Sequence, residues 1–372
     1  MRRIVALVLA GVLVLAVLVT IVVSRGGGAK HLTVVHGVIG SEKKPFFDDA
    51  DVKKAFAKKG YDVQVDTAGS RAMATTTDLT QYDFAFPAGT PTAQKIQRDH
   101  KANATYVPFF TPMAIATFDP IAQLLTQAGV AHKDGDTYRL DVKAFLDLVK
   151  DNKRWNQLPN NTSYPVSKSV LVTSTDIQTS NSAAMYASIA SYVANGNNVL
   201  DGPDKVDSVI PVVSPLFTRQ GFAESSSDAP FEDYLSIGIG KTPMVMVYEA
   251  QFVDRAAQHD GSITKDMVLM YPDPDVLSKH TLVPLSDKGD KVGRLLTDDP
   301  TLQHLAVVHG FRTSNRADFT SFVKTQRVAV ASDVLDIIEP PTYETLEQLI
   351  VTISKELHGP QAQSVTTTTR SP

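Results

Sequence analysis

A run of hydroxyl, amide and carboxylate side chains precedes a predicted helix in the middle of the chain. Residues 170–172 form an apolar run suited to a buried strand, and the spacing of Tyr186, Ile189, Ala190 and Val193 is typical of an amphipathic helix. The polar residues between the two are Thr173, Ser174, Thr175, Asp176, Thr179, Ser180, Asn181 and Ser182. Free backbone N–H groups and the positive end of the helix dipole could bind an anion there without a neutralising side chain. The same residues also suit a helix that is simply well capped, and the sequence leaves that alternative open.

Further strands are predicted at residues 31–38, 63–65 and 82–86, and a polar turn follows each of them. Strands that alternate with helices predict a parallel α/β sheet, in which the turns after the strands meet at one edge, where ligands bind. The candidate ligand contacts in these turns are Gly40, Ser41, Ser70, Arg71, Gly89 and Thr90.

The chemistry of these turns leaves the charge of a ligand open. Ser41 and Ser70 each follow a glycine, which lets bare backbone approach a ligand, although ordinary turn chemistry explains the same pairs. Arg71 could hold an oxyanion or carboxylate with two parallel N–H bonds, or could be a solvated surface residue. Glu42 and Glu249 would repel an anion if they faced the site, so a cationic or zwitterionic solute remains an alternative.

The composition is typical of a globular protein, and the sequence contains no recognisable catalytic motif. The 372 residues are 43% hydrophobic, carry a net charge of −4 and include no cysteine. This charge balance argues against a nucleic-acid partner, and disulfides and thiolate metal sites are excluded. The smallest spacing between histidines is five residues, as between His304 and His309, which does not place both rings on one helical face. No nucleophile elbow, phosphate loop or dinucleotide fingerprint is present, so we expect no enzyme activity, no metal and no cofactor.

The first 30 residues form a separate region. Arg2 and Arg3 precede an apolar run over residues 4–23, which matches the length needed to cross a bilayer. No convincing cleavage site follows, so an uncleaved signal anchor with a flexible tether is expected, with the rest of the chain outside the cytoplasm.

The remaining chain alternates strand and helix patterns. Further strands are predicted at 107–118, 244–248, 267–271 and 279–285. The region 197–230, rich in Gly, Pro, Ser and Asp, is expected to be mostly loop with a short strand or helix inside. Helices are predicted at 46–59, 121–129, 141–150, 291–296, 302–309, 318–324 and 343–357. The tail over 358–372 is low in complexity and is predicted to be disordered.

Several of these features resemble the type II periplasmic solute-binding proteins that serve ATP-driven (ABC-type) importers. RWNQL, a short apolar strand and TSTDIQTSNSAAMYASIASYVANG are similar to the segment that opens a ligand-facing helix in the sulfate and molybdate binders. Thr179, Ser180 and Asn181 stand where those proteins have Thr-Ser-Gly, but the preceding Asn-Pro-Lys is not matched here. MVMVYEAQF resembles the strand and loop with a cleft-facing aromatic, which would be Tyr248, and KHTLVPLSDKGDKVGRLLTDDP resembles the return to the first lobe.

The resemblance implies an α/β fold of two lobes with parallel-rich sheets and two crossover hinge strands, following an N-terminal transmembrane helix. Residues 31–113 and 286–357, including the C-terminal helices, would form the first lobe, and 114–285 the second lobe with the hinge strands. The implied function is a membrane-tethered, single-pass extracytoplasmic receptor that binds a small anion or polar solute between the lobes and serves an ABC transporter permease. The alternative is a membrane-anchored sensor or scaffold that uses the same fold for protein contacts at the cell envelope.

Overall fold

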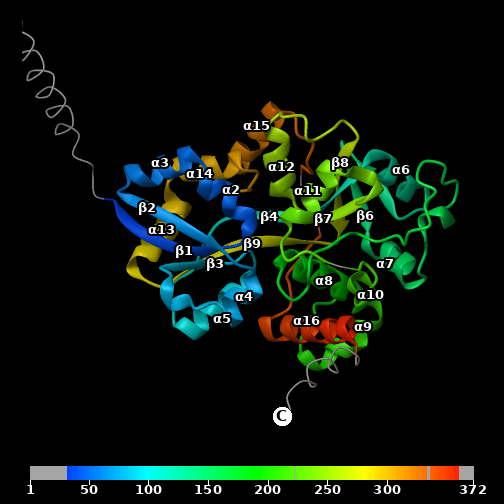
Figure 1. Ribbon diagram of the computed structural model, residues 1–372, viewed down its shortest axis with the longest axis horizontal. Helices are drawn as coiled ribbons and strands as arrows, with labels where there is room; N and C mark the ends of the chain where they lie inside the picture. The colour runs from blue at the N-terminus through cyan, green and yellow to red at the C-terminus, as the bar shows by residue number, and fades with distance from the viewer. Residues whose placement is uncertain (1–31, 222, 333–335, 360–372) are drawn as a thin grey trace, which may run out of the picture.

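The computed structural model describes residues 32–221, 223–332 and 336–359, which form two lobes side by side (Figure 1). The predicted anchor and tether at 1–30 and the tail from 360 onward lie outside the described residues. Within the described part of the chain, no helix combines the length and the apolar character that a membrane span requires.

The first lobe is a sheet covered by helices on both faces. Its parallel strands are β1 (Thr33–Ile39), β2 (Tyr61–Thr67) and β3 (Phe84–Phe86), with β1 between the other two. One face is covered by α2 (Lys44–Asp48), α3 (Ala50–Lys58), α13 (Asp287–Asp298) and α14 (Pro300–Val308), whose apolar side chains share one core. The other face is covered by α4 (Ser70–Thr75) and α5 (Thr90–His100), and short 3-10 turns occur at η1 (Ser41–Lys43) and η2 (Leu79–Gln81).

Two long strands pass between the lobes. β4 (Tyr106–Phe118) pairs with β9 (Asp275–Pro284) through its first half and with second-lobe strands through its second half, while β9 also pairs with β3. This arrangement makes the ten strands one continuous sheet in which β4 and β9 connect the two halves.

The second lobe has a mixed sheet. β4 pairs antiparallel with β7 (Met244–Tyr248) and β8 (Met267–Asp273), β6 (Thr137–Asp141) pairs antiparallel with β5 (Ala131–Asp134), and β6 pairs parallel with β8. The strand β10 (Ile337–Ile338) adds a short parallel pair to β9. The prediction of parallel-rich sheets therefore fits the first lobe, whereas most pairs in the second lobe are antiparallel.

Helices cover both faces of the second lobe. They are α6 (Asp119–Gln127), α7 (Val142–Lys150), α8 (Asn181–Ala194), α9 (Val206–Val213), α10 (Pro215–Thr218), α11 (Asp228–Ser236) and α12 (Glu249–Ala257), with 3-10 turns η3 (Trp155–Gln157), η4 (Pro203–Lys205) and η5 (Gly238–Gly240). α15 (Arg316–Gln326) packs against both α12 and the first-lobe helix α14. The region 197–230, predicted to be mostly loop, thus contains α9, α10 and the start of α11. The predicted strand at 170–172 is wrong as well, because only Thr173 forms an isolated parallel bridge, to Val245 of β7.

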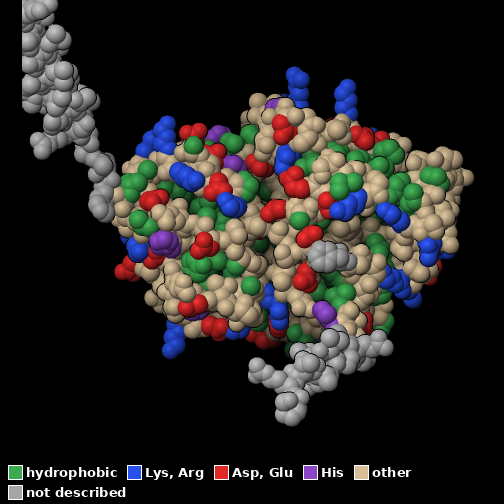
Figure 2. Space-filling view, viewed as in Figure 1, with side chains coloured by type: hydrophobic (Ala, Val, Ile, Leu, Met, Phe, Trp, Pro, Cys, Tyr) green, Lys and Arg blue, Asp and Glu red, His purple; other side chains and the backbone are tan. Residues whose placement is uncertain are grey.

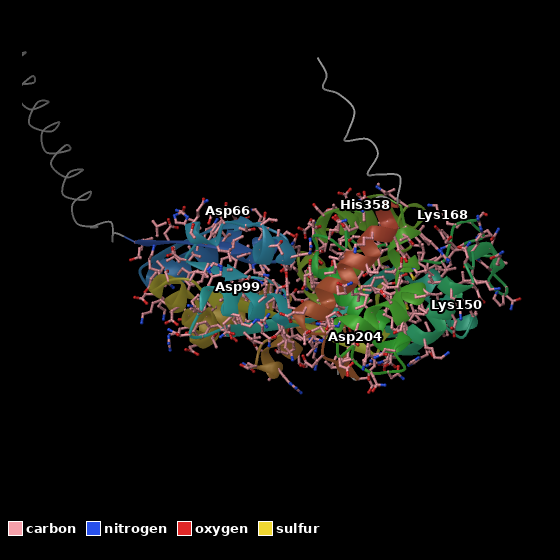
Figure 3. All side chains as sticks on the ribbon, turned by 90° about the horizontal axis from the view of Figure 1, so that it is seen from below. Asp66, Asp99, Lys150, Lys168, Asp204 and His358 are labelled. Carbon is pink, nitrogen blue, oxygen red and sulfur yellow. The ribbon has the colours of Figure 1, made fainter. Side chains whose placement is uncertain are left out.

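The C-terminal helix α16 (Tyr343–His358) packs on the second lobe, although the sequence places this segment with the first. Its apolar side chains Leu346, Leu349, Ile350 and Ile353 join the second-lobe core, and the helix contacts α8, α9 and α10. Seen from below, α16 runs along the second lobe from the boundary between the lobes to His358 (Figure 3). An amphipathic pattern defines the buried face of a helix but does not determine which lobe covers it.

Candidate functional site

A cavity of about 250 Å³ lies between the lobes, at the edge of the first-lobe sheet where strands β1 and β2 end. The first lobe contributes the turns after these two strands, and the second lobe contributes the start of α8, the residues before α11 and Tyr248. Its described lining consists of Gly40, Ser41, Glu42, Thr67, Ala68, Gly69, Ser70, Ala72, Thr179, Ser180, Asn181, Ser225, Ser226, Ser227 and Tyr248. None of these lining residues is a lysine or an arginine.

The two lobes touch beside this cavity. A Cβ atom on Gly69, in the first lobe, would lie 2.3 Å from the backbone oxygen of Thr179 in the second lobe, so only glycine allows this approach. Arg71 reaches from α4 to the carboxylate of Glu347 on α16, with Nε 2.9 Å from Oε2, and to the backbone oxygen of Gln178 at 3.3 Å. These contacts close the cleft on the side next to the cavity.

The N-termini of α8 and α11 supply unused hydrogen-bond donors at the cavity. The first N–H groups of any helix lack intrahelical acceptors. In α8, 14 residues long, the side chain of the N-cap Ser180 accepts no bond from a backbone N–H of the first turn, and its hydroxyl contacts the Ser182 hydroxyl at 3.0 Å instead. Ser227, the N-cap of α11, also makes no capping bond. Both helices therefore place N–H groups and the positive ends of their dipoles where a partial negative charge would be stabilised.

Buried hydroxyl groups add hydrogen-bonding capacity to the cavity wall. Ser227 is 3% exposed, and its hydroxyl has no hydrogen-bond partner among the described residues. Ser70 is equally buried and accepts a bond from the Ala88 N–H at 3.1 Å, which leaves its own proton available. Asn181 donates to the Tyr248 hydroxyl at 3.1 Å, and burial holds the pKa of that phenol well above its usual range. Tyr248 therefore acts as a neutral donor or acceptor at neutral pH.

Glu42 is the one ionised group in the described lining, and it has two partners behind the wall. Its Oε1 contacts the fully buried Lys43 ammonium and lies 3.4 Å from His280 Nδ1. Burial opposes the charge of Glu42, but Lys43 and His280 outweigh it and lower the pKa to about 2. Burial and the Lys43 charge lower the pKa of His280 to about 4, so the imidazole is neutral and Nδ1 can accept from Lys43 at 3.1 Å.

The structure brings together seven of the twelve predicted site residues. Gly40, Ser41, Ser70, Thr179, Ser180, Asn181 and Tyr248 all line the cavity. Whether they contact a ligand stays a prediction.

The other five predicted residues lie outside the cavity for identifiable reasons. Arg71 is turned toward Glu347. Gly89 and Thr90 begin α5, and Asn181 fills the space in front of Gly89, where an added Cβ would be 2.5 Å from Asn181 Oδ1. Ser174 is buried beside Gln220, and Ser182 bonds to Ser180 and Thr175.

The sequence prediction did not include several lining residues. Thr67 and Ala68 follow β2, and Ser225, Ser226 and Ser227 precede α11. The serine run before Asp228 and an apolar stretch is a helix-start pattern that would have indicated the second site helix. Glu42 was not among the predicted contacts, although the sequence raised it as a residue that would repel an anion and would leave a cationic or zwitterionic solute open.

Solved structures with a similar fold are periplasmic binding proteins. The sulfate-binding protein SubI from Mycobacterium tuberculosis H37Rv matches with a TM-score of 0.52 and 15% identity, over 84% of this chain and 96% of that one. The match to fructose-6-phosphate-bound AfuA from Actinobacillus pleuropneumoniae has a TM-score of 0.50 and 11% identity, and it covers 87% of this chain and 95% of AfuA. The match to iron-bound HitA from Pseudomonas aeruginosa has a TM-score of 0.50 and 9% identity, and it covers 87% of this chain and 99% of HitA. No family model matches the sequence, and no curated protein matches it significantly.

At these identities the likeness concerns the fold. The chain has the two-lobe α/β fold of the type II periplasmic solute-binding proteins, the substrate-binding components of ABC importers, which confirms the resemblance found in the sequence.

Proposed function

We propose that the protein is a membrane-tethered, extracytoplasmic solute-binding protein that captures a small anion or polar solute in the cavity between its lobes and delivers it to an ABC-type permease. The observation that carries this proposal is the cavity itself, in which the N-termini of α8 and α11 and several buried hydroxyls converge from the second lobe on turns of the first. Donors arranged in this way bind a polar solute without performing chemistry on it.

The similar structures support the binding of a small solute but do not identify which solute this protein binds. They include proteins described as binding sulfate, iron and fructose-6-phosphate, so one fold holds solutes of different charge. The lining of this cavity favours a solute with an anionic or strongly polar group, because it presents N–H and O–H donors. Its described residues include no lysine or arginine, so helix N-termini and hydroxyl groups would have to hold that group.

A ligand screen with the full-length protein in detergent tests the proposal. Inorganic oxyanions, sugars, amino acids and metal ions are added one at a time while the thermal midpoint is recorded. A true ligand at about 100 times its Kd stabilises the folded state by about 2.7 kcal/mol and raises the midpoint. No shift with any polar solute would contradict the proposal and would leave the scaffold alternative.

The tether is tested separately by fractionation. Full-length protein made in cells should remain in the membrane pellet after alkaline carbonate extraction, and a protease added outside should digest the two lobes. Recovery of the lobes in the soluble fraction with a new N-terminus would show that the first segment is removed.

A further inference from the structure

A second cavity of about 150 Å³ adjoins the first through Glu42, which lines both. It has a different chemical character, because its wall combines phenylalanine rings with carboxylates. The residues that matter here are Phe46, Phe231, Phe311, Glu42, Asp228 and Glu232. Rings and carboxylates together form the environment that attracts an organic ammonium group.

Glu42 presents an unsatisfied oxygen at this junction. Lys43 and His280 both contact Oε1, and Oε2 has no partner among the described residues, although the side chain is only 6% exposed. Oε2 is not sealed from the cavity space, so water can hydrate it when no solute is bound. It is therefore available to a hydrogen-bond donor or a positive group of a solute at the junction.

Among the described carboxylates of the second cavity, Asp228 is the one without a cationic partner. Glu42 is paired with Lys43 and Glu232 with Arg255, and His309 Nδ1 lies 3.0 Å from Asp254 Oδ1. The side-chain partners of Asp228 are neutral: the Gln251 amide, at 2.9 Å, and the Ser41 hydroxyl. Burial and the nearby charge of Glu42 raise the pKa of Asp228. A bound cation would relieve this repulsion and favour the ionised form of Asp228.

We infer that the ligand is an organic zwitterion, with its anionic group at the N-termini of α8 and α11 and its ammonium group between Glu42, Asp228 and the phenylalanine wall. The inference rests on the proposed function and specifies the class of solute. The two ends of the proposed site disfavour different kinds of solute. The carboxylates disfavour plain dianions, and the helix N-termini disfavour simple cations.

Calorimetric titration of the full-length protein with matched isosteres tests the inference. The pairs are glycine betaine with 3,3-dimethylbutanoate, taurine with propane-1-sulfonate, and phosphoethanolamine with propyl phosphate. Each pair keeps the anionic group and shape and removes only the positive charge. We expect at least one zwitterion to bind about tenfold or more tightly than its isostere, a difference of about 1.4 kcal/mol.

The alternative outcomes separate this inference from the proposed function. Equal binding within every pair, or tighter binding of the isosteres or of inorganic sulfate, would overturn the zwitterion and leave an anion receptor. Binding of a sugar or another uncharged solute, but of none of the six compounds, would overturn the zwitterion alone. Absence of binding by the six compounds and by every solute of the thermal screen would overturn both.

Variants of residues that line the second cavity test where the ammonium group binds. Asp228→Asn should reduce the preference for the zwitterion to about threefold or less and change isostere binding little, because the amide retains the shape but not the charge. Glu232→Gln is a second variant of the same wall if Asp228→Asn does not fold. The matched control is Asp204→Asn, at an exposed site on the second lobe (Figure 3), which should leave the preference unchanged. An undiminished preference in both cavity variants would contradict the placement of the ammonium group.

Discussion

Glu42 and Glu249 are two buried glutamates near the hinge strands, and they differ in how their oxygens are used. Both oxygens of Glu249 are bonded: Oε1 accepts from Arg312 Nε at 2.7 Å, and Oε2 accepts from an Arg312 nitrogen at 2.8 Å and from the Tyr271 hydroxyl at 2.6 Å. Glu42 has its partners on Oε1 alone and lines two cavities.

This difference in oxygen partners marks Glu249 as a structural carboxylate and Glu42 as one that is available to a solute. A charge with a full set of partners stabilises a packed region and has no capacity for a further contact. The sequence raised both residues as acids that might face the cleft, and the structure places only Glu42 there. On the face shown in Figure 2, acidic and basic side chains are interspersed, whereas Glu42 and Glu249 are held inside the molecule.

The largest expected effect comes from removing the cation of each pair. Arg312→Ala leaves Glu249 charged and enclosed, so the free energy of unfolding should fall by about 3–5 kcal/mol. Lys43→Met should lower the free energy of unfolding by less than Arg312→Ala does, with a difference of at least about 2 kcal/mol, because water in the cavities can hydrate Glu42. Urea unfolding followed by the fluorescence of Trp155, the only tryptophan and fully buried, measures both. Arg316→Ala, an exposed arginine, is the control; equal losses for Arg312→Ala and Lys43→Met would remove the distinction between the glutamates.

A second test uses the pH dependence of the Glu42 region. The folded-state pKa of His280 is lowered to about 4 from 6.5, so the unfolded state binds the proton first as pH falls. Stability is therefore full above about pH 6.5 and should fall by about 3 kcal/mol as the pH approaches 4. The lowered pKa of Glu42 predicts a further loss between about pH 4.5 and 2. In urea titrations at stepped pH, His280→Phe should abolish the upper stage and also reduce the lower one, because His280 helps to lower the pKa of Glu42. An unchanged profile would show that other groups cause the upper stage.

The smallest effects distinguish two buried serines. Ser278 donates to the Ala88 oxygen at 2.6 Å and accepts from Asn181, so Ser278→Ala should lower stability by about 1–2 kcal/mol. Ser227→Ala removes a hydroxyl without a partner among the described residues and should leave stability within about 0.5 kcal/mol. Its effect should appear instead as an affinity about fivefold weaker for a ligand from the screen. A large stability loss in Ser227→Ala would show that this serine has a structural role.

Local sequence patterns predicted much of the fold and half of the site. The strand and helix order of the first lobe and the polar start of α8 depend on short-range periodicity and hydroxyl residues, which the sequence displays directly. The pattern failed at 197–230, where Pro211 lies inside α9 and tertiary packing overrides its usual effect.

The missing half of the site depends on long-range contacts. Glu42 faces the cavities because of Lys43 and His280, and His280 lies more than two hundred positions further along the chain. Arg71 was considered as a clamp for an anion or as a solvated surface residue, because its pairing with Glu347, far along the chain on α16, cannot be read from the sequence. Neither relation is visible in residue spacing.

The contact at Gly69 has a practical consequence. Because a methyl group there would overlap the Thr179 carbonyl, Gly69→Ala would act as a spacer that holds the two halves apart without altering a single polar group of the pocket. Such a variant would provide a reference for the open receptor in scattering or fluorescence-transfer measurements, against which closure by any solute can be calibrated.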